Sequence, residues 1–176
     1  MTYCEKIEEI GILDASFVTN EDLDTLSHLP TLQKLELGKL GHLEMRELSM
    51  NEKKSLNLNL FFQTLNTDNL KLLSISQCEL ITEENVITLS ENGCPKLERL
   101  VLEKCPNLKV KENTLKTLVE KCPQIQSMQF HWKIITQISD LFWNEVNKTI
   151  NIVISMGDNY LSIEDFVRNK KGIIQQ

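Results

Sequence analysis

The stretch that decides the fold is Cys94-Pro95-Lys96-Leu97-Glu98-Arg99-Leu100-Val101-Leu102-Glu103-Lys104-Cys105, which a polar-capped apolar segment joins to Cys122-Pro123-Gln124-Ile125. Its central pattern is Leu-x-x-Leu-x-Leu-x-x-Cys, and this pattern recurs along the chain. An internal repeat of this length indicates a stack of similar supersecondary units. Such stacks present extended surfaces rather than closed pockets, so the repeat favours binding over catalysis.

Four units align without gaps over the part that alternates like a strand, and a fifth begins at Ile125. Their apolar positions are Ile7, Ile10, Ile12 and Ala15; Leu32, Leu35, Leu37 and Leu40; Leu70, Leu73, Ile75 and Cys78; Leu97, Leu100, Leu102 and Cys105; and Ile125, Met128 and Phe130. Ile150, Ile152 and Ile154 indicate a further strand without the full signature. The period-two spacing predicts a strand with one buried face in each unit.

The second half of each unit predicts a helix. Thr19 and Thr82 occupy equivalent positions and are followed by acidic residues, as is typical of a helix start. Apolar residues then recur with helical spacing, as the pairs Leu23 and Leu26, Val86 and Leu89, and Leu115 and Leu118. Each unit is therefore expected to be a short strand followed by a helix.

This pattern resembles the cysteine-containing leucine-rich repeat of F-box-type substrate receptors. Cys78 with Ile81-Thr82, and Cys94 with Cys105, match the consensus of that subtype over a resemblance spanning residues 4–133. Ala15 and Leu40 depart from it at the ninth position of the first two units. The resemblance implies an α/β leucine-rich repeat solenoid, shaped as a horseshoe with a parallel concave sheet and convex helices.

The repeats are expected to occupy residues 1–156, with an insertion near 41–55 in the longer second unit. This charged segment is either a binding loop or an excursion without a role. The helix of that unit is predicted from Leu58, Phe61, Phe62 and Leu65, which are spaced as one apolar face.

Residues 157–176 are expected to form a C-terminal cap helix and tail, which a repeat stack needs over its last open layer. Ser162 is the predicted N-cap, with Asp165 in a box-like position, and Gly172 is the predicted stop. The first repeat begins close to Met1, so its apolar edge is expected to be covered by upstream domains of a longer chain, by a partner, or by Tyr3.

Composition narrows the class of protein. With a net charge of −6 and a pI of about 5.2, the chain lacks the excess of basic residues that is typical of a nucleic-acid-binding protein. No apolar run reaches the length of a membrane span, and the N-terminus has no signal-like segment. The five cysteines follow the repeat register and are interpreted as small buried hydrophobes, which favours a reducing compartment, cytoplasmic or nuclear.

No motif points to catalysis. His28, His42 and His131 lie in different repeats without metal-ligand spacing, and no glycine-rich phosphate loop is present. We therefore expect a chain that is not an enzyme and that has no cofactor and no metal site.

Binding is expected on the concave face, where the residues between the buried apolar positions point. This predicts a protein-binding set of Leu13, Lys34, Glu36, Leu72, Ser74, Arg99, Val101, Glu103, Gln129, His131 and Trp132. Leu13, Leu72 and Val101 are apolar where solvent exposure is expected, and aromatic and arginine side chains are typical binding anchors. Trp132 has the alternative of packing under the C-terminal cap.

The expected function is protein–protein interaction without catalysis, with one or more proteins as partners. The resemblance implies that the chain is the substrate-recognition part of a ubiquitin ligase. This implication rests on the subtype of the repeat and not on a binding site. The alternatives are a scaffold or adaptor subunit of another multiprotein complex, and an inhibitor that regulates an enzyme.

Overall fold

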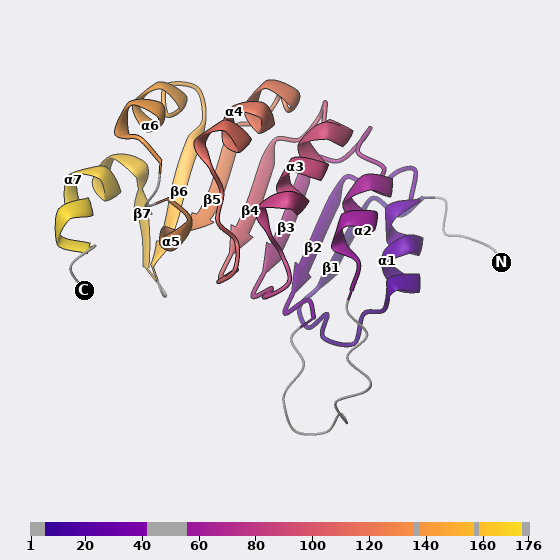
Figure 1. The fold of residues 1–176 in the computed structure, drawn as a ribbon. Helices are drawn as coiled ribbons and strands as arrows, with labels where there is room; N and C mark the ends of the chain where they lie inside the picture. Colours follow the sequence, from indigo (N-terminus) through magenta and orange to yellow (C-terminus); the bar gives the residue numbers. More distant parts are fainter. Residues whose placement is uncertain (1–5, 42–55, 136–137, 157–158, 174–176) are drawn as a thin grey trace, which may run out of the picture.

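The computed structural model describes residues 6–41, 56–135, 138–156 and 159–173. These residues form an α/β structure around one sheet of seven strands, which lie side by side in sequence order (Figure 1). The first six strands are parallel, and the last pairs with its neighbour in the antiparallel sense. Parallel neighbours need a crossover, and helices supply it for most of the sheet.

Strands and helices alternate along most of the chain. The strands are β1 (Glu9–Ile12), β2 (Lys34–Gly38), β3 (Leu72–Ser76), β4 (Arg99–Glu103), β5 (Ser127–His131), β6 (Asn151–Met156) and β7 (Asn159–Ser162). The helices are α1 (Asn20–Ser27), α2 (Leu58–Thr64), α3 (Glu83–Asn92), α4 (Glu112–Lys121), α5 (Trp132–Ile135), α6 (Asp140–Val146) and α7 (Ile163–Ile173). The repeating order of strand and helix is as the sequence predicts.

The register of the sheet also agrees with the sequence alignment. Leu35, Leu73 and Leu100 are direct neighbours on β2, β3 and β4, as are Leu37, Ile75 and Leu102. All six side chains are buried, because they point from the sheet towards the helices. The intervening residues therefore share the opposite face.

A recurring turn follows three of the strands. Lys39, Gln77 and Lys104 have φ angles of 54°, 53° and 53°, a left-handed conformation that is uncommon for residues other than glycine. The backbone N–H of Lys39 donates to Ser76 O at 2.9 Å, and that of Gln77 donates to Glu103 O at 2.9 Å. Each of these two bonds links a turn to the next strand, which keeps successive units in register.

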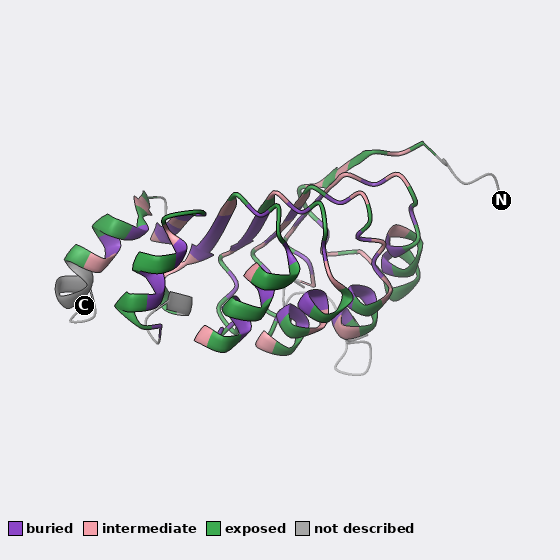
Figure 2. Cartoon of the chain, turned by 90° about the horizontal axis from the view of Figure 1, so that it is seen from above, coloured by how far each residue is buried: buried purple, intermediate pink, exposed green. Residues whose placement is uncertain are grey.

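The core lies between the sheet and the helices, which line one side of it (Figure 2). Cys78, Cys94, Cys105 and Cys122 are buried there and form no disulfide. Burial raises the pKa of the Cys105 thiol to about 12, and a hydrogen bond with Cys122 together with burial raises the pKa of Cys94. Cys94 and Cys105 are therefore packing residues rather than nucleophiles.

Side chains cap the helices where the sequence predicts. The Thr19 hydroxyl accepts from Asp22 N at 3.2 Å, while the Asp22 carboxylate accepts from Thr19 N at 2.9 Å. Thr82 N donates to Asn85 Oδ1 at 2.8 Å. Ser162 Oγ accepts from Asp165 N at 3.2 Å, which confirms the predicted start of α7.

A carboxylate links two neighbouring helices. Glu112 Oε2 accepts from Ser139 Oγ at 2.7 Å at the start of α6, and Glu112 Oε1 lies 2.9 Å from Lys116 Nζ. The hydrogen bond from Ser139, followed by that from Lys116, lowers the pKa of Glu112 to about 2. Its folded pKa therefore lies below the unfolded value of about 4.3.

Replacing Glu112 with glutamine is expected to destabilise the protein at pH 7 and to lose this effect at low pH. A depressed folded pKa contributes stability that is present above about 4.3 and is lost as the pH falls towards about 2. Urea denaturation at pH 7 and at pH 2 measures the difference from wild type. Glu120→Gln on the same helix is the control, and a Glu112→Gln effect that is equal at both pH values would exclude this ionic role.

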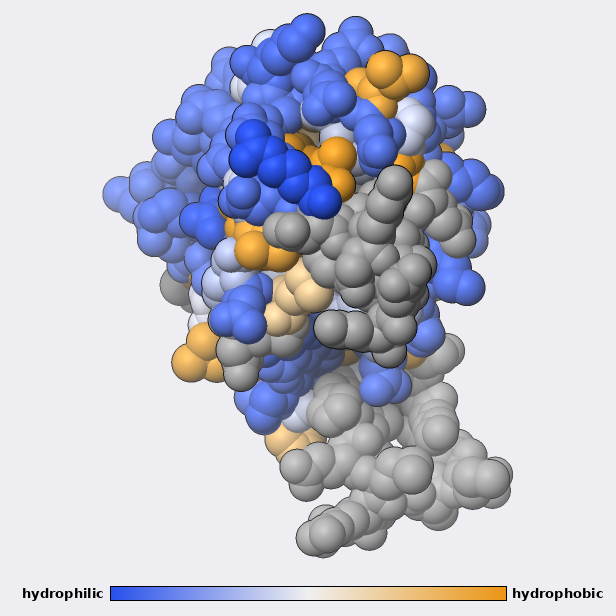
Figure 3. All heavy atoms as spheres, turned by 90° about the vertical axis from the view of Figure 1, so that its left-hand side faces the viewer, coloured by the Kyte–Doolittle hydropathy of each residue, from blue (hydrophilic) through white to orange (hydrophobic). Residues whose placement is uncertain are grey.

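The C-terminal region differs from the sequence prediction at α5, at β7 and at the end of α7. The short helix α5 and the antiparallel strand β7 were not predicted. Gly172 was predicted as a helix stop, which is wrong because α7 continues to Ile173. The predicted insertion lies almost wholly outside the described residues, as does Tyr3. The end of the molecule near α6 and α7 is mainly hydrophilic with separate apolar patches (Figure 3).

Candidate functional site

The sheet has one face that no described helix covers, and we call it the open face (Figure 2). Its residues form the rows Glu9, Lys34, Leu72, Arg99 and Ser127; Gly11, Glu36, Ser74, Val101 and Gln129; and Gly38, Ser76 and Glu103. His131 ends β5 in register with Ser155 of β6. The structure therefore gathers the predicted site residues on one surface, with Leu13 and Trp132 immediately beyond strand ends.

A chain of polar contacts crosses the C-terminal half of the open face. A guanidinium N–H of Arg99 donates to Gln129 Oε1 at 3.5 Å, and Gln129 Nε2 donates to Glu103 Oε2 at 3.0 Å. Tyr160 completes the chain, since its hydroxyl donates to Glu103 Oε1 at 3.3 Å. These side chains come from β4, β5 and β7, so the contacts fix the geometry of this half of the face.

Two predicted contact residues are less accessible than expected. Val101 is 7% exposed and Gln129 is 8% exposed, so the prediction that they face solvent is wrong. The two residues are direct neighbours in the sheet, and Gln129 bonds to the residues two before and two after Val101. Because these bonds hold the polar side chains over Val101, its apolar surface contributes to packing rather than to a free contact.

His131 and Trp132 close the face at its C-terminal end. Their ring centroids lie 6.0 Å apart, and both residues are partly buried. The His131 Nδ1 atom is buried and has no hydrogen-bond partner among the described residues. Desolvation, followed by the charge of Lys133, lowers the pKa of His131. Trp132 packs against the core as the first residue of α5, so it combines a packing role with partial exposure.

The N-terminal half of the face contains a hollow of about 210 Å³. Gly11, Gly38, Ser74 and Ser76 have small side chains or none, and Glu36 stands among them. Lys34 Nζ lies 2.6 Å from Glu9 Oε1, while Glu36 is exposed. This half is therefore recessed, and it exposes the Glu36 carboxylate.

Apolar side chains are exposed after the end of β1, where Leu13 lines the hollow. Leu13 is 91% exposed and Phe17 is 87% exposed in the segment that follows β1. Leu72 is partly buried on the open face itself. Leu13 and Leu72 thus give the face apolar contact points, as the sequence predicts, whereas Val101 does not.

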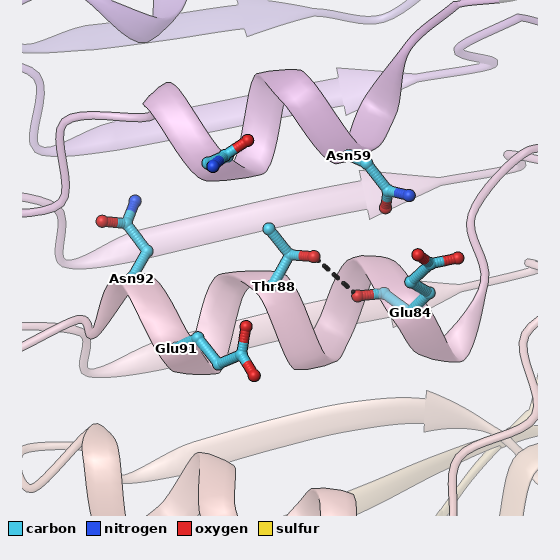
Figure 4. A pocket seen from close by; sticks show the side chains of 6 residues that line it. Asn59, Glu84, Thr88, Glu91 and Asn92 are labelled. Carbon is cyan, nitrogen blue, oxygen red and sulfur yellow. Dashed lines mark hydrogen bonds between the residues drawn. The ribbon is translucent and has the colours of Figure 1, made fainter.

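Two further hollows lie on the helix side. The larger, of about 460 Å³, is a groove between α2 and α3, with Asn59 on one helix and Glu84 and Glu91 on the other (Figure 4). Asn59 accepts a hydrogen bond from Asn85, so part of the polar lining of this groove is already used in packing α2 against α3. The smaller, of about 200 Å³, lies between α6 and α7 and includes Trp143 in its lining.

The described residues contain no cluster of histidine, cysteine, aspartate and glutamate side chains suited to a metal ion. None of the described helices has the length and apolar content that a membrane crossing requires. A comparison with protein-family models, curated proteins and solved structures found no match. The open face is therefore the candidate site on the strength of its own geometry.

Tyr160 is the site residue that sequence reasoning missed. It lies in β7, within the segment that was interpreted as a cap, yet its hydroxyl reaches Glu103 on β4. Tyr160 is 56% exposed, and tyrosine is enriched among residues that dominate binding energy. The alternation of Asn159 to Ser162 could have indicated a strand, but nothing local indicates where that strand pairs.

Proposed function

We propose that this chain is a leucine-rich repeat solenoid that recognises another protein with the open face of its sheet and has no catalytic activity. The observation that supports this most is the open face itself. It displays aligned rows of charged, polar and apolar side chains on a sheet whose other side is covered by helices. Rigid elements hold these side chains, so binding does not require their ordering.

The proposal extends to cellular context. We propose a cytoplasmic or nuclear protein, because the buried cysteines remain thiols. We further propose that it supplies substrate recognition to a ubiquitin ligase, on the resemblance of its repeats to the cysteine-containing subtype. A scaffold or adaptor subunit, or an enzyme inhibitor, would use the same face with a different partner.

Affinity capture from native cells with quantitative mass spectrometry tests the proposal. The test variant is Leu13→Asp combined with Leu72→Asp, which places two charges on or beside the open face. The control is Leu141→Asp combined with Ile87→Asp, at exposed positions of α6 and α3. We expect partner recovery to fall about tenfold or more in the test variant, because a charge buried in an interface is costly, and to change little in the control.

The identity of the captured proteins separates the roles. Cullin-ligase components together with a labile client, with only the client lost in the test variant, would support the substrate receptor. A single partner at fixed stoichiometry would support a scaffold subunit, and inhibition of one captured enzyme would support the inhibitor. Retention of every partner by the test variant would exclude the open face as the binding surface.

A further inference from the structure

The open face has two groups of opposite charge, Glu36 and Arg99, that form no ion pair within the described residues. Lys34 Nζ is bound to the Glu9 carboxylate. Because this one ammonium group already pairs with Glu9, it offsets the charge of the nearby Glu36 carboxylate only in part. Within the described part of the chain, no hydrogen bond or ion pair holds the Glu36 carboxylate. This position therefore retains an accessible negative charge.

Arg99 provides the positive charge. It is exposed, and its one hydrogen bond among the described residues is the 3.5 Å contact with the neutral Gln129 amide. The closest carboxylate along its own strand face, Glu103, is already bonded to Gln129 and Tyr160. The guanidinium is thus held in place while most of its N–H groups stay available for a partner.

The register fixes how these charges are spaced. Arg99 is in line with Leu72 and Lys34, and Glu36 lies two residues beyond Lys34 on β2. Neighbouring strands are about 4.8 Å apart and two residues span about 6.6 Å, so the Cα atoms of Glu36 and Arg99 lie roughly 12 Å apart. Partly exposed Leu72 occupies the strand between them.

We propose that the open face binds an extended segment of a partner protein in which a basic and an acidic residue stand four positions apart with an apolar residue midway. Four residues of extended chain span about 13 Å, and alternate residues point to one side, so all three side chains face the sheet. The basic residue pairs with Glu36, the apolar residue contacts Leu72, and the acidic residue pairs with Arg99. This inference rests on the proposed function and adds the chemistry of the partner.

Two synthetic peptides test this pattern, because the charges alone do not set the chain direction. They are acetyl-Gly-Ser-Arg-Thr-Leu-Thr-Glu-Ser-Gly-amide and the same peptide with arginine and glutamate exchanged. Titration of the ¹⁵N-labelled protein, followed by its amide NMR spectrum, should show binding of one peptide with a Kd on the order of 1 mM. The shifts should concentrate at Glu36, Leu72 and Arg99, which lie along the path of the proposed segment.

Charge reversal provides the decisive comparison. Glu36→Arg and Arg99→Glu should each weaken binding of the preferred peptide by about threefold or more, since exposed ion pairs are individually weak. The double variant should instead prefer the other peptide, because the face keeps its favoured chain direction while the order of its two charges along that direction is reversed. Glu91→Arg on α3 is the control for a change of net charge and should leave binding within about twofold of wild type.

Absence of binding by both peptides, or the same preference in the double variant as in wild type, would overturn this inference. The capture experiment reports separately on the proposed function. If the partner is lost from the Leu13→Asp, Leu72→Asp variant while neither peptide binds wild type, the face is the binding surface and only the segment proposed here is wrong.

Discussion

Replacing Phe130 with alanine is expected to lower the free energy of unfolding by about 3–5 kcal/mol. Phe130 lies in β5 with no exposed surface, in register with Leu102 and Ile154 of the neighbouring strands. Removing the Phe130 ring leaves a cavity between successive units. The units cannot move together to fill it, because the strand pairing of the sheet holds them in register. Urea denaturation followed by circular dichroism measures the change.

Phe17→Ala is the matched control, because the same side chain is removed at a position that is 87% exposed. It should change the free energy of unfolding by no more than about 0.5 kcal/mol. If Phe130→Ala does not fold, Phe130→Leu should still be destabilised, by about 1 kcal/mol. Equal effects of the two alanine substitutions would contradict the burial of β5 described above.

Replacing Gly38 with alanine is expected to cost about 1–3 kcal/mol, the range for an overpacked site. A Cβ atom at this position would lie 2.5 Å from the backbone oxygen of Leu13 and 3.2 Å from its carbonyl carbon. The Gly38 carbonyl also accepts from Ala15 N at 2.7 Å, so the strand cannot move away without losing this bond. The N-terminal edge of the open face depends on this close approach.

Gly11→Ala is the control on the neighbouring strand, since nothing lies within 4 Å of a Cβ atom there. It should be neutral or stabilise by up to about 1 kcal/mol, because alanine restricts the unfolded chain. Urea midpoints of the two variants give the comparison. If the Gly38→Ala protein were as stable as the Gly11→Ala protein, the segment after β1 would not pack closely against β2.

Much of the fold could be predicted from the sequence because the repeat fixes its two strongest constraints. The period-two alternation sets which residues of β2, β3 and β4 face the core, and units of similar form stack in register. Both constraints can be read from the local pattern of apolar residues in each unit. The predicted rows from Glu9 to Ser127 and from Gly11 to Gln129 are therefore those of the structure.

The details of the site depend on contacts that no local pattern encodes. Val101 is covered because Gln129 of the next strand bonds on both sides of it, and Tyr160 reaches β4 from the far edge of the sheet. Gly172 does not end α7, because a glycine within a helix costs only about 1 kcal/mol and ends it only where a turn demands it. The cover over Val101 and the reach of Tyr160 follow from tertiary packing, whereas the continuation of α7 is a local effect.

Site-specific photocrosslinking tests the proposed use of the open face most directly. A benzophenone amino acid replaces Leu72 on the open face in one protein and Leu141 on the helix side in the other, and both are irradiated in native cells. We predict specific crosslinks to partner protein from position 72 and none above background from position 141. Crosslinks to that partner from position 141 alone would contradict recognition through the open face.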